Sequence, residues 1–201
     1  MIQNYIFDFG NVLANFYEEM LTEPYVPDAK LRKTISEVVF DRAYWDRLDD
    51  GSITDEEVRT EIRRRLPEEH WELGCLVYDS WVKTLTPVPG MEKLVFDLKK
   101  AGKKLYLLSN ISIGFAESYR EVPWLEKLLG CFDGVVFSGM IAMVKPNREI
   151  FTYLLDTYSL KPEECLFVDD RKENLQGAET AGIRGYLFQG DAEKLRKYLG
   201  V

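Results

Sequence analysis

Four short segments of this 201-residue chain place carboxylate, hydroxyl, amide and amino groups shortly after apolar stretches. These groups are Asp8, the pair Ser109-Asn110, Lys145, and the pair Asp169-Asp170. Together they offer a nucleophile, oxygen ligands for a divalent cation and donors for the oxygens of a phosphate, which are the parts that phosphoryl transfer requires. We therefore treat these residues as candidates for a phosphoryl-transfer site.

The apolar stretches that precede these groups have the length and composition of buried strands, and helical patterns separate the later ones. We expect strands at 5–7, 105–108, 135–137, 165–168 and 186–188, and helices near 91–98, 147–158 and 173–181. Short apolar strands that alternate with helices predict a parallel sheet with both faces covered. The carboxyl ends of parallel strands share one edge, so the four segments should meet in one crevice. A single Asp or Ser at a strand end is more often a turn former or helix cap, and only the convergence of four segments favours a site.

The region between the first two strands has a different, helical pattern. Leu31, Ile35, Val38 and Val39 form a helical stripe, and the segment 54–57 has the form of a capping box that opens another helix. The turn signals Val88-Pro89-Gly90 follow this region. We predict a small helical cap at 16–86, inserted after the first strand of an α/β core that comprises 1–15 and 87–201.

Composition and charge exclude several classes of function. The net charge is −8 with acidic and basic residues interspersed, which argues against a nucleic-acid or anionic-membrane surface. No apolar run approaches the roughly 18 residues of a membrane span, and the acidic N-terminal segment is unlike a signal peptide, so a cytoplasmic location is expected. Three cysteines without Cys-x-x-Cys spacing and a single histidine, His70, make zinc and histidine-based mechanisms poor candidates.

The order of the motifs resembles a known family. The segments IFDFGNVL, LLSN, Lys145-Pro146 and LFVDDRKEN resemble the four motifs of the haloacid dehalogenase superfamily, with the helical insertion where its first type of cap occurs. The Asp-x-Gly-Asn-Val form of the first motif is similar to that of bacterial sugar phosphatases acting on glucose 1-phosphate, and to the phosphatase domain of soluble epoxide hydrolases. The resemblance implies a three-layer Rossmann-like core and a magnesium-dependent phosphatase for a small phosphate monoester, with a hexose 1-phosphate favoured.

The resemblance also implies a role for each residue of the first three motifs. Asp8 would be the nucleophile that forms an aspartyl-phosphate, and it would also ligate magnesium. Ser109 and Asn110 would donate hydrogen bonds to the phosphoryl oxygens. Lys145 would pair with the phosphate and keep the carboxylate of Asp8 anionic.

In the fourth motif, Asp169 would bind the cation. Asp170 would complete the water shell of the cation or orient Lys145, since two adjacent carboxylates repel each other unless a cation lies between them. Asn174 would steady this loop through hydrogen bonds.

One position departs from the common pattern of these phosphatases. Most carry a second aspartate two residues after the nucleophile, as the acid and base of the reaction, and here that position is Gly10. The loop at Gly10 is expected either to offer its backbone carbonyl to magnesium or to make a turn that suits only glycine. Water, the substrate or a residue at the cap entry, for which Asn15, Tyr17 and Glu18 are candidates, would then supply the proton.

Alternative functions stay open at this stage. A catalytically weakened phosphate-binding or regulatory protein would also lack the second aspartate, and a metal-independent 2-haloacid dehalogenase would use the same nucleophile but normally lacks the metal-site acids. The expected partner is a small phosphorylated metabolite, and the oligomeric state is not predicted. The aromatic residues of the insertion are assigned to its own core rather than to a substrate pocket; they are Tyr44, Trp45, Trp71, Tyr78 and Trp81.

Overall fold

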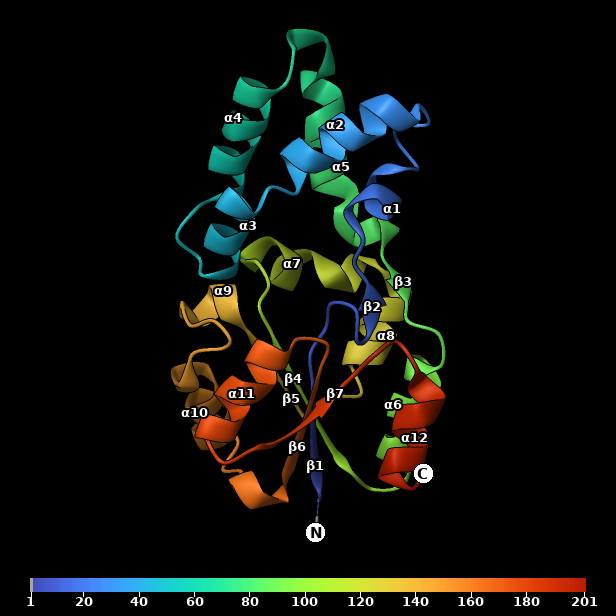
Figure 1. The fold of residues 1–201 in the computed structure, drawn as a ribbon, viewed down its shortest axis with the longest axis vertical. Coiled ribbons are helices and arrows are strands. Elements are labelled where there is room, and N and C mark those ends of the chain that lie inside the picture. Colours follow the sequence, from blue (N-terminus) through green and yellow to red (C-terminus); the bar gives the residue numbers. More distant parts are fainter. Residues whose placement is uncertain (1) are drawn as a thin grey trace.

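A five-stranded parallel sheet lies at one end of the molecule, and a stack of helices covers the edge at which its strands end (Figure 1). The computed structural model describes residues 2–201. The strand order is β5-β4-β1-β6-β7, and every neighbouring pair is parallel. The strands are β1 (Asn4–Phe7), β4 (Lys104–Ser109), β5 (Gly134–Phe137), β6 (Cys165–Asp169) and β7 (Arg184–Leu187). The predicted α/β sheet is confirmed, although β7 begins two residues earlier than expected.

Side chains alternate along the strands, so each face of the sheet contributes to its own hydrophobic cluster. Tyr5 and Phe7 of β1 belong to the larger hydrophobic cluster, whereas Ile6 between them belongs to the smaller one. The larger cluster contains residues of α6 (Met91–Lys100), α8 (Pro123–Leu129) and α12 (Ala192–Leu199). The smaller cluster contains residues of α10 (Arg148–Thr157) and α11 (Lys172–Thr180). The result is three layers, with helices on each face of a buried sheet.

Five α-helices lie between the short strands β2 (Ala14–Asn15) and β3 (Thr86–Pro87). They are α1 (Glu18–Thr22), α2 (Ala29–Val39), α3 (Arg42–Asp49), α4 (Asp55–Arg65) and α5 (Trp71–Thr84), with a short 3-10 helix η1 (Glu68–His70) between the last two. Local sequence explains where α4 begins. The side chain of Thr54 accepts a hydrogen bond from the backbone N–H of Glu57, and the side chain of Glu57 accepts one from the backbone N–H of Thr54. The predicted capping box is therefore present.

Two short strands lie at the base of these helices. β2 (Ala14–Asn15) pairs in antiparallel fashion with β3 (Thr86–Pro87), so the segments that enter and leave the helical region lie side by side. We call α1–α5 the cap and the sheet with its flanking helices the core. The predicted boundaries at 16 and 86 coincide with this pair of strands, and the division into two domains stays a prediction.

The remaining helices of residues 2–201 are short and belong to the core. They are α7 (Ile113–Ser118) and the 3-10 helix η2 (Tyr119–Glu121) after β4, α9 (Ser138–Ile141) after β5, and the 3-10 helix η3 (Pro162–Glu164) just before β6. Trp81 of α5 stacks on Phe115 of α7 with ring centroids 5.7 Å apart, and the larger hydrophobic cluster runs continuously from the sheet into the cap. Within residues 2–201, every helix is too short or too polar to cross a membrane.

Candidate active site

The first candidate, Asp8, lies at the carboxyl end of β1, in the middle of the sheet edge that faces the cap. Its backbone N–H donates to the carbonyl of Val168, which continues the pairing with β6 by one residue. Its Oδ1 accepts a hydrogen bond of 2.7 Å from the backbone N–H of Phe9. Within residues 2–201 no hydrogen bond reaches Oδ2 of Asp8. One oxygen is therefore held and the other is left to face the adjacent pocket.

Lys145 connects two of the candidate carboxylates. Its Nζ lies 2.7 Å from Oδ1 of Asp8 and 2.9 Å from Oδ2 of Asp169, and only 1% of its side chain is exposed. Burial by itself lowers the pKa of Lys145, but the two carboxylates outweigh this effect and hold the pKa above its ordinary value. Lys145 is therefore a fixed ammonium group at the centre of the site.

The side chain of Asn110 fixes the backbone of Lys145. Its Nδ2 donates to the carbonyl of Lys145 at 2.9 Å, and its Oδ1 accepts from the N–H of Lys145 at 2.8 Å. Asn110 can therefore donate to a phosphate only through the second hydrogen of its side-chain amide or through its own backbone N–H. Ser109 ends β4, is buried and lines the same pocket as Asp8.

Asp169 and Asp170 have different surroundings. Asp169 is fully buried, and besides Lys145 its carboxylate accepts from the backbone N–H of Arg171 at 2.8 Å and from Nδ2 of Asn174 at 3.0 Å. Asp169, not Asp170, therefore orients Lys145, and Asn174 steadies the loop as expected. Asp170 lines the pocket, where burial and then the neighbouring Asp169 raise its pKa.

Asp8, Asp169 and Asp170 form the acidic cluster of the site. Each offers an oxygen, and these oxygens lie within 4.8 Å of one another. A single buried ammonium faces the three carboxylates, so negative charge is in excess. Burial raises the pKa of Asp8 to about 7, Lys145 opposes the rise and Asp169 adds to it. A divalent cation with a preference for oxygen ligands would supply the missing positive charge, and Mg²⁺ matches this set of donors.

Of the two expectations for Gly10, a turn that suits only glycine is wrong. Its backbone is outside the left-handed region, and a Cβ at this position would meet only Cβ of Phe16 at 4.0 Å. The left-handed residue of the loop is Asn11, with φ 54°, and its Oδ1 accepts from the N–H of Phe16 at 2.9 Å. The turn therefore does not require glycine at position 10, and a metal contact by the carbonyl of Gly10 stays a prediction.

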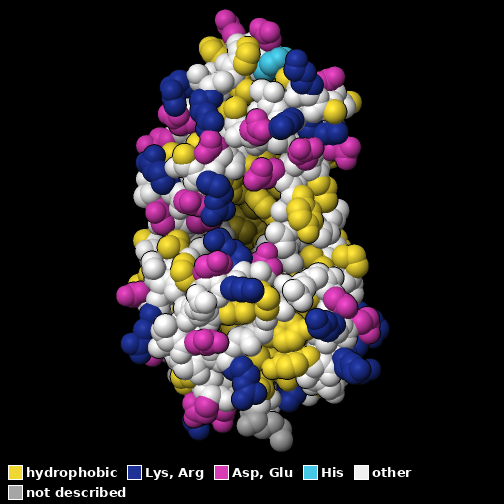
Figure 2. Space-filling view, viewed as in Figure 1, with side chains coloured by type: hydrophobic (Ala, Val, Ile, Leu, Met, Phe, Trp, Pro, Cys, Tyr) yellow, Lys and Arg dark blue, Asp and Glu magenta, His cyan; other side chains and the backbone are white. Residues whose placement is uncertain are grey.

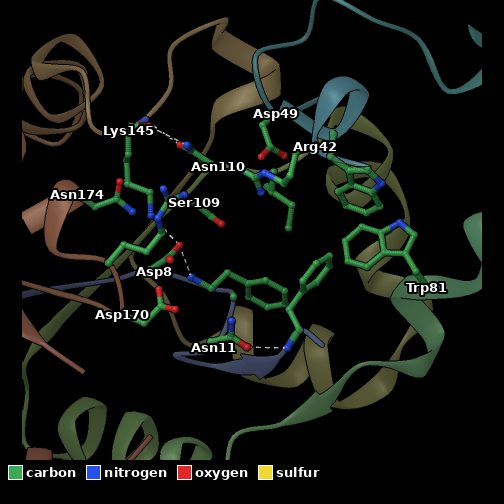
Figure 3. A pocket seen from close by; sticks show the side chains of 16 residues that line it. Asp8, Asn11, Arg42, Asp49, Trp81, Ser109, Asn110, Lys145, Asp170 and Asn174 are labelled. Atoms are coloured by element: carbon green, nitrogen blue, oxygen red, sulfur yellow. Dashed lines mark hydrogen bonds and ion pairs between the residues drawn. The ribbon is translucent and has the colours of Figure 1, made fainter. Parts of the chain in front are cut away.

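A pocket of about 140 Å³ lies between the core and the cap. Figure 2 shows it as a hollow with a hydrophobic floor and charged side chains at its rim. Figure 3 shows Asp8, Ser109 and Asn110 on its core side. The volume is close to the roughly 150 Å³ of an engineered protein cavity that holds benzene, so a small ligand fits without rearrangement.

Aromatic rings form one wall of this pocket. Phe16, Trp45 and Trp81 line it, and their centroids lie 5.3–5.6 Å apart. The assignment of the cap aromatics to a hydrophobic core is thus incomplete, because Trp45 and Trp81 are buried in the core and also present a surface to the pocket. Tyr44 and Tyr78 are buried in the cap and do not line the pocket.

Two further cap residues line the pocket and were not among the candidates. They are Arg42 and Asp49, at the two ends of α3. Of the predicted proton donors, Tyr17 is exposed and Asn15 donates to the carbonyl of Pro87. No local motif marks Asp49, because its entry into the pocket depends on how α3 docks on the core.

Comparison with known proteins gives consistent matches. The profile of the haloacid dehalogenase-like hydrolases matches residues 2–182. A sesquiterpene phosphatase of Aspergillus oryzae is 25% identical over 180 residues, which are 90% of this chain and 86% of the relative. D-ribitol-5-phosphate phosphatase of Bacteroides thetaiotaomicron is 24% identical, and the match spans 96% of this chain and 95% of the relative.

Two further matches concern the predicted branch and the fold. Bifunctional epoxide hydrolase 2 of Mus musculus is 38% identical over 66 residues, and the match spans 33% of this chain but only 12% of that longer protein. A haloacid dehalogenase family enzyme of Bacteroides thetaiotaomicron, crystallised with magnesium and inorganic phosphate, has a TM-score of 0.74 at 24% identity, with 97% of this chain and 99% of the other covered. This structural likeness confirms the α/β fold.

Proposed function

Since the chain belongs to the haloacid dehalogenase-like hydrolase family, we propose that it is a magnesium-dependent phosphatase that forms an aspartyl-phosphate on Asp8. The observation that carries the proposal is the acidic cluster of Asp8, Asp169 and Asp170 around the ammonium of Lys145. Two relatives named as phosphatases support the same reaction. Each of them matches at least 90% of the length of this chain.

The contacts of Asp8 suggest how it reacts. Oδ2 attacks phosphorus while Oδ1 stays bound to Lys145 and to the N–H of Phe9, which limits rotation of the carboxylate. Ser109 and Asn110 lie beside Asp8 in the pocket and donate to the phosphoryl oxygens. A bound magnesium ion would neutralise phosphate oxygens and keep the acidic cluster ionised.

The substrate is a small phosphorylated metabolite. The pocket of about 140 Å³ has room for a phosphoryl group and a short leaving group while the cap is in its present position. A hexose 1-phosphate, the substrate favoured from the sequence, requires additional space from an opening of the cap, and the aromatic wall offers a surface on which a sugar ring can pack.

The test is a set of initial rates after EDTA treatment, with and without added magnesium. The substrates are a hexose 1-phosphate, a pentitol 5-phosphate, a triose phosphate and an isoprenoid phosphate. Hydrolysis that appears only with magnesium supports the proposal, and undiminished hydrolysis without a cation contradicts it. Binding of phosphate with no turnover on any ester favours the catalytically weakened protein, and metal-free release of chloride from a 2-haloacid favours the dehalogenase.

A further inference from the structure

Phosphate ester cleavage leaves an alkoxide that must gain a proton, and Gly10 stands where related enzymes carry an acid for this step. On the basis of the phosphatase function above, we propose that Asp49 of the cap protonates the leaving oxygen and then activates the water that releases phosphate. This assigns a catalytic role to a residue outside the four motifs.

The direction of attack places the leaving oxygen on the cap side. Asp8 attacks from the carboxyl end of β1, and attacking and leaving oxygens lie roughly in line across phosphorus. The leaving oxygen therefore points away from the sheet. The side chains that line the pocket from this side are Phe16, Arg42, Trp45, Asp49 and Trp81. Only a carboxyl group among these side chains exchanges protons near neutral pH, because a guanidinium stays charged and an indole does not ionise.

The carboxylate of Asp49 is free to meet a ligand. The residue is only 9% exposed, and within residues 2–201 no hydrogen bond or ion pair reaches its side-chain oxygens. Figure 3 shows Asp49 on the side of the pocket opposite Asp170, with its carboxylate directed inward. A buried carboxylate without a protein partner is costly unless a ligand or a proton compensates it.

The backbone of Asp49 is anchored to the core. Its carbonyl accepts a hydrogen bond from Oγ of Ser138, and the same Oγ accepts from the N–H of Ile111 at 2.8 Å. Ile111 follows Asn110 in the loop after β4, so a single hydroxyl ties the end of α3 to the phosphate-facing loop. With the cap docked as it is here, this hydrogen bond holds the end of α3 against the core and sets the position of Asp49 relative to Asp8.

The charges around Asp49 suit both steps. Burial raises its pKa to about 7. Arg42 and, more weakly, Lys145 oppose this rise, whereas Asp46 and, more weakly, Asp8 add to it. A carboxyl group with this pKa is present in both protonation states near neutral pH. The same group can therefore act first as an acid and then as a base.

The two steps balance as follows. Oδ2 of Asp8 forms a bond to phosphorus, the ester P–O bond breaks, and its electron pair takes the proton of Asp49, which releases the alcohol. Asp49 then removes a proton from water as the water oxygen attacks phosphorus. The bond between Asp8 and phosphorus breaks, which returns Asp8 as a carboxylate and Asp49 in its protonated form with inorganic phosphate as product.

The experiment compares ethyl phosphate with 2,2,2-trifluoroethyl phosphate in the magnesium-loaded protein. These esters have similar size and no hydroxyl group, but trifluoroethanol is the more acidic leaving group and needs less protonation. Asp49→Asn should lower kcat/KM for ethyl phosphate by about 10²–10³-fold and for the trifluoroethyl ester by less than about tenfold. Glu37→Gln, which removes an exposed carboxylate of cap helix α2 that does not line the pocket, is the control and should change neither value more than about twofold.

A pH profile adds a measurement that needs no variant. In the wild type, the ratio of kcat/KM for ethyl to trifluoroethyl phosphate should fall as pH rises through about 7, because the acid form of Asp49 is lost. Enzyme ionisations shared by both reactions cancel in this ratio once each kcat/KM is divided by the dianion fraction of its ester, because the trifluoroethyl ester has the lower second pKa. The fall should vanish in Asp49→Asn. An equal loss of activity on both esters, or a flat ratio in the wild type, would overturn the role of Asp49, whereas a wild type inactive on every phosphate ester would overturn the phosphatase function itself.

Discussion

The two sides of the pocket hold their polar groups in opposite ways. On the core side, the carboxylate of Asp169 accepts hydrogen bonds from Lys145, Asn174 and the backbone of Arg171. On the cap side, within residues 2–201, the carboxylate of Asp49 has no such partner. The core is thus organised before a ligand arrives, while the cap presents one unpaired group among aromatic rings.

The difference extends to the charge that each side needs. Asp8 lies in a cluster where negative charge is in excess, and a cation would balance it. Asp49 lies at the end of α3 with no hydrogen bond or ion pair to its carboxylate within residues 2–201, and a proton balances it. The core side therefore depends on a cation and binds the phosphate, whereas the cap side depends on a proton and serves the leaving group. A change on one side should leave the other side intact.

The largest effect is expected from Asp8→Asn. An amide is a poor nucleophile of nearly the same volume, so turnover should fall by more than about 10⁴-fold. The melting temperature without added cation should stay the same or rise, because the substitution removes negative charge from the crowded cluster. Steady-state rates and calorimetry measure the two quantities, and residual activity within tenfold of wild type would show that another group attacks phosphorus.

Lys145→Ala should give the next largest effect. Loss of the ammonium removes a fixed positive charge beside Asp8, and kcat is expected to fall by about 10²–10³-fold, as for other preorganised charge stabilisers. Truncation also leaves Asp169 buried without its charged partner, so the free energy of unfolding should fall. Lys99→Ala, which removes an ion pair on the core surface, is a control that should leave kcat unchanged. A change in kcat below twofold for Lys145→Ala would show that this lysine has only a structural role.

The pH dependence of stability should separate core from cap. Both Asp8 and Asp49 have a pKa raised to about 7, so the folded protein binds protons more tightly than the unfolded chain and loses stability as pH rises from about 4 to about 7. Saturating magnesium should remove the part due to Asp8, and Asp49→Asn should remove the other part. Thermal melts between pH 4 and pH 8 measure both. A fall that magnesium abolishes completely in the wild type would contradict the separate character of Asp49.

The smallest effect is expected from Gly10→Asp, which asks whether the core can supply the proton instead. The new Cβ has room and the backbone is unstrained, so with saturating magnesium to balance the added carboxylate the free energy of unfolding should change by less than about 1 kcal/mol. In an Asp49→Asn background, Gly10→Asp should raise kcat/KM for ethyl phosphate severalfold relative to the trifluoroethyl ester. Equal rates with and without the added carboxylate would mean that position 10 does not reach the leaving oxygen.

The sequence by itself determined the framework and most of the core site. Apolar runs that end in Asp8, Ser109 and Asp169 mark parallel strands, and the topology of such strands brings their carboxyl ends to one edge. The capping box at Thr54 is also a local pattern, because all its partners lie within three residues. These features are predictable since they depend on spacing along the chain and on a general rule of strand order.

The tertiary structure alone decided which acid orients Lys145, which side of Trp45 and Trp81 faces the pocket, and that Asp49 enters it. Adjacent aspartates such as Asp169 and Asp170 are equivalent in sequence, and they diverge because successive side chains leave a strand end in different directions. Asp49 reaches the pocket through a hydrogen bond between its carbonyl and Ser138, 89 positions away. Contacts between residues so far apart depend on the docking of whole helices, and no local spacing encodes them.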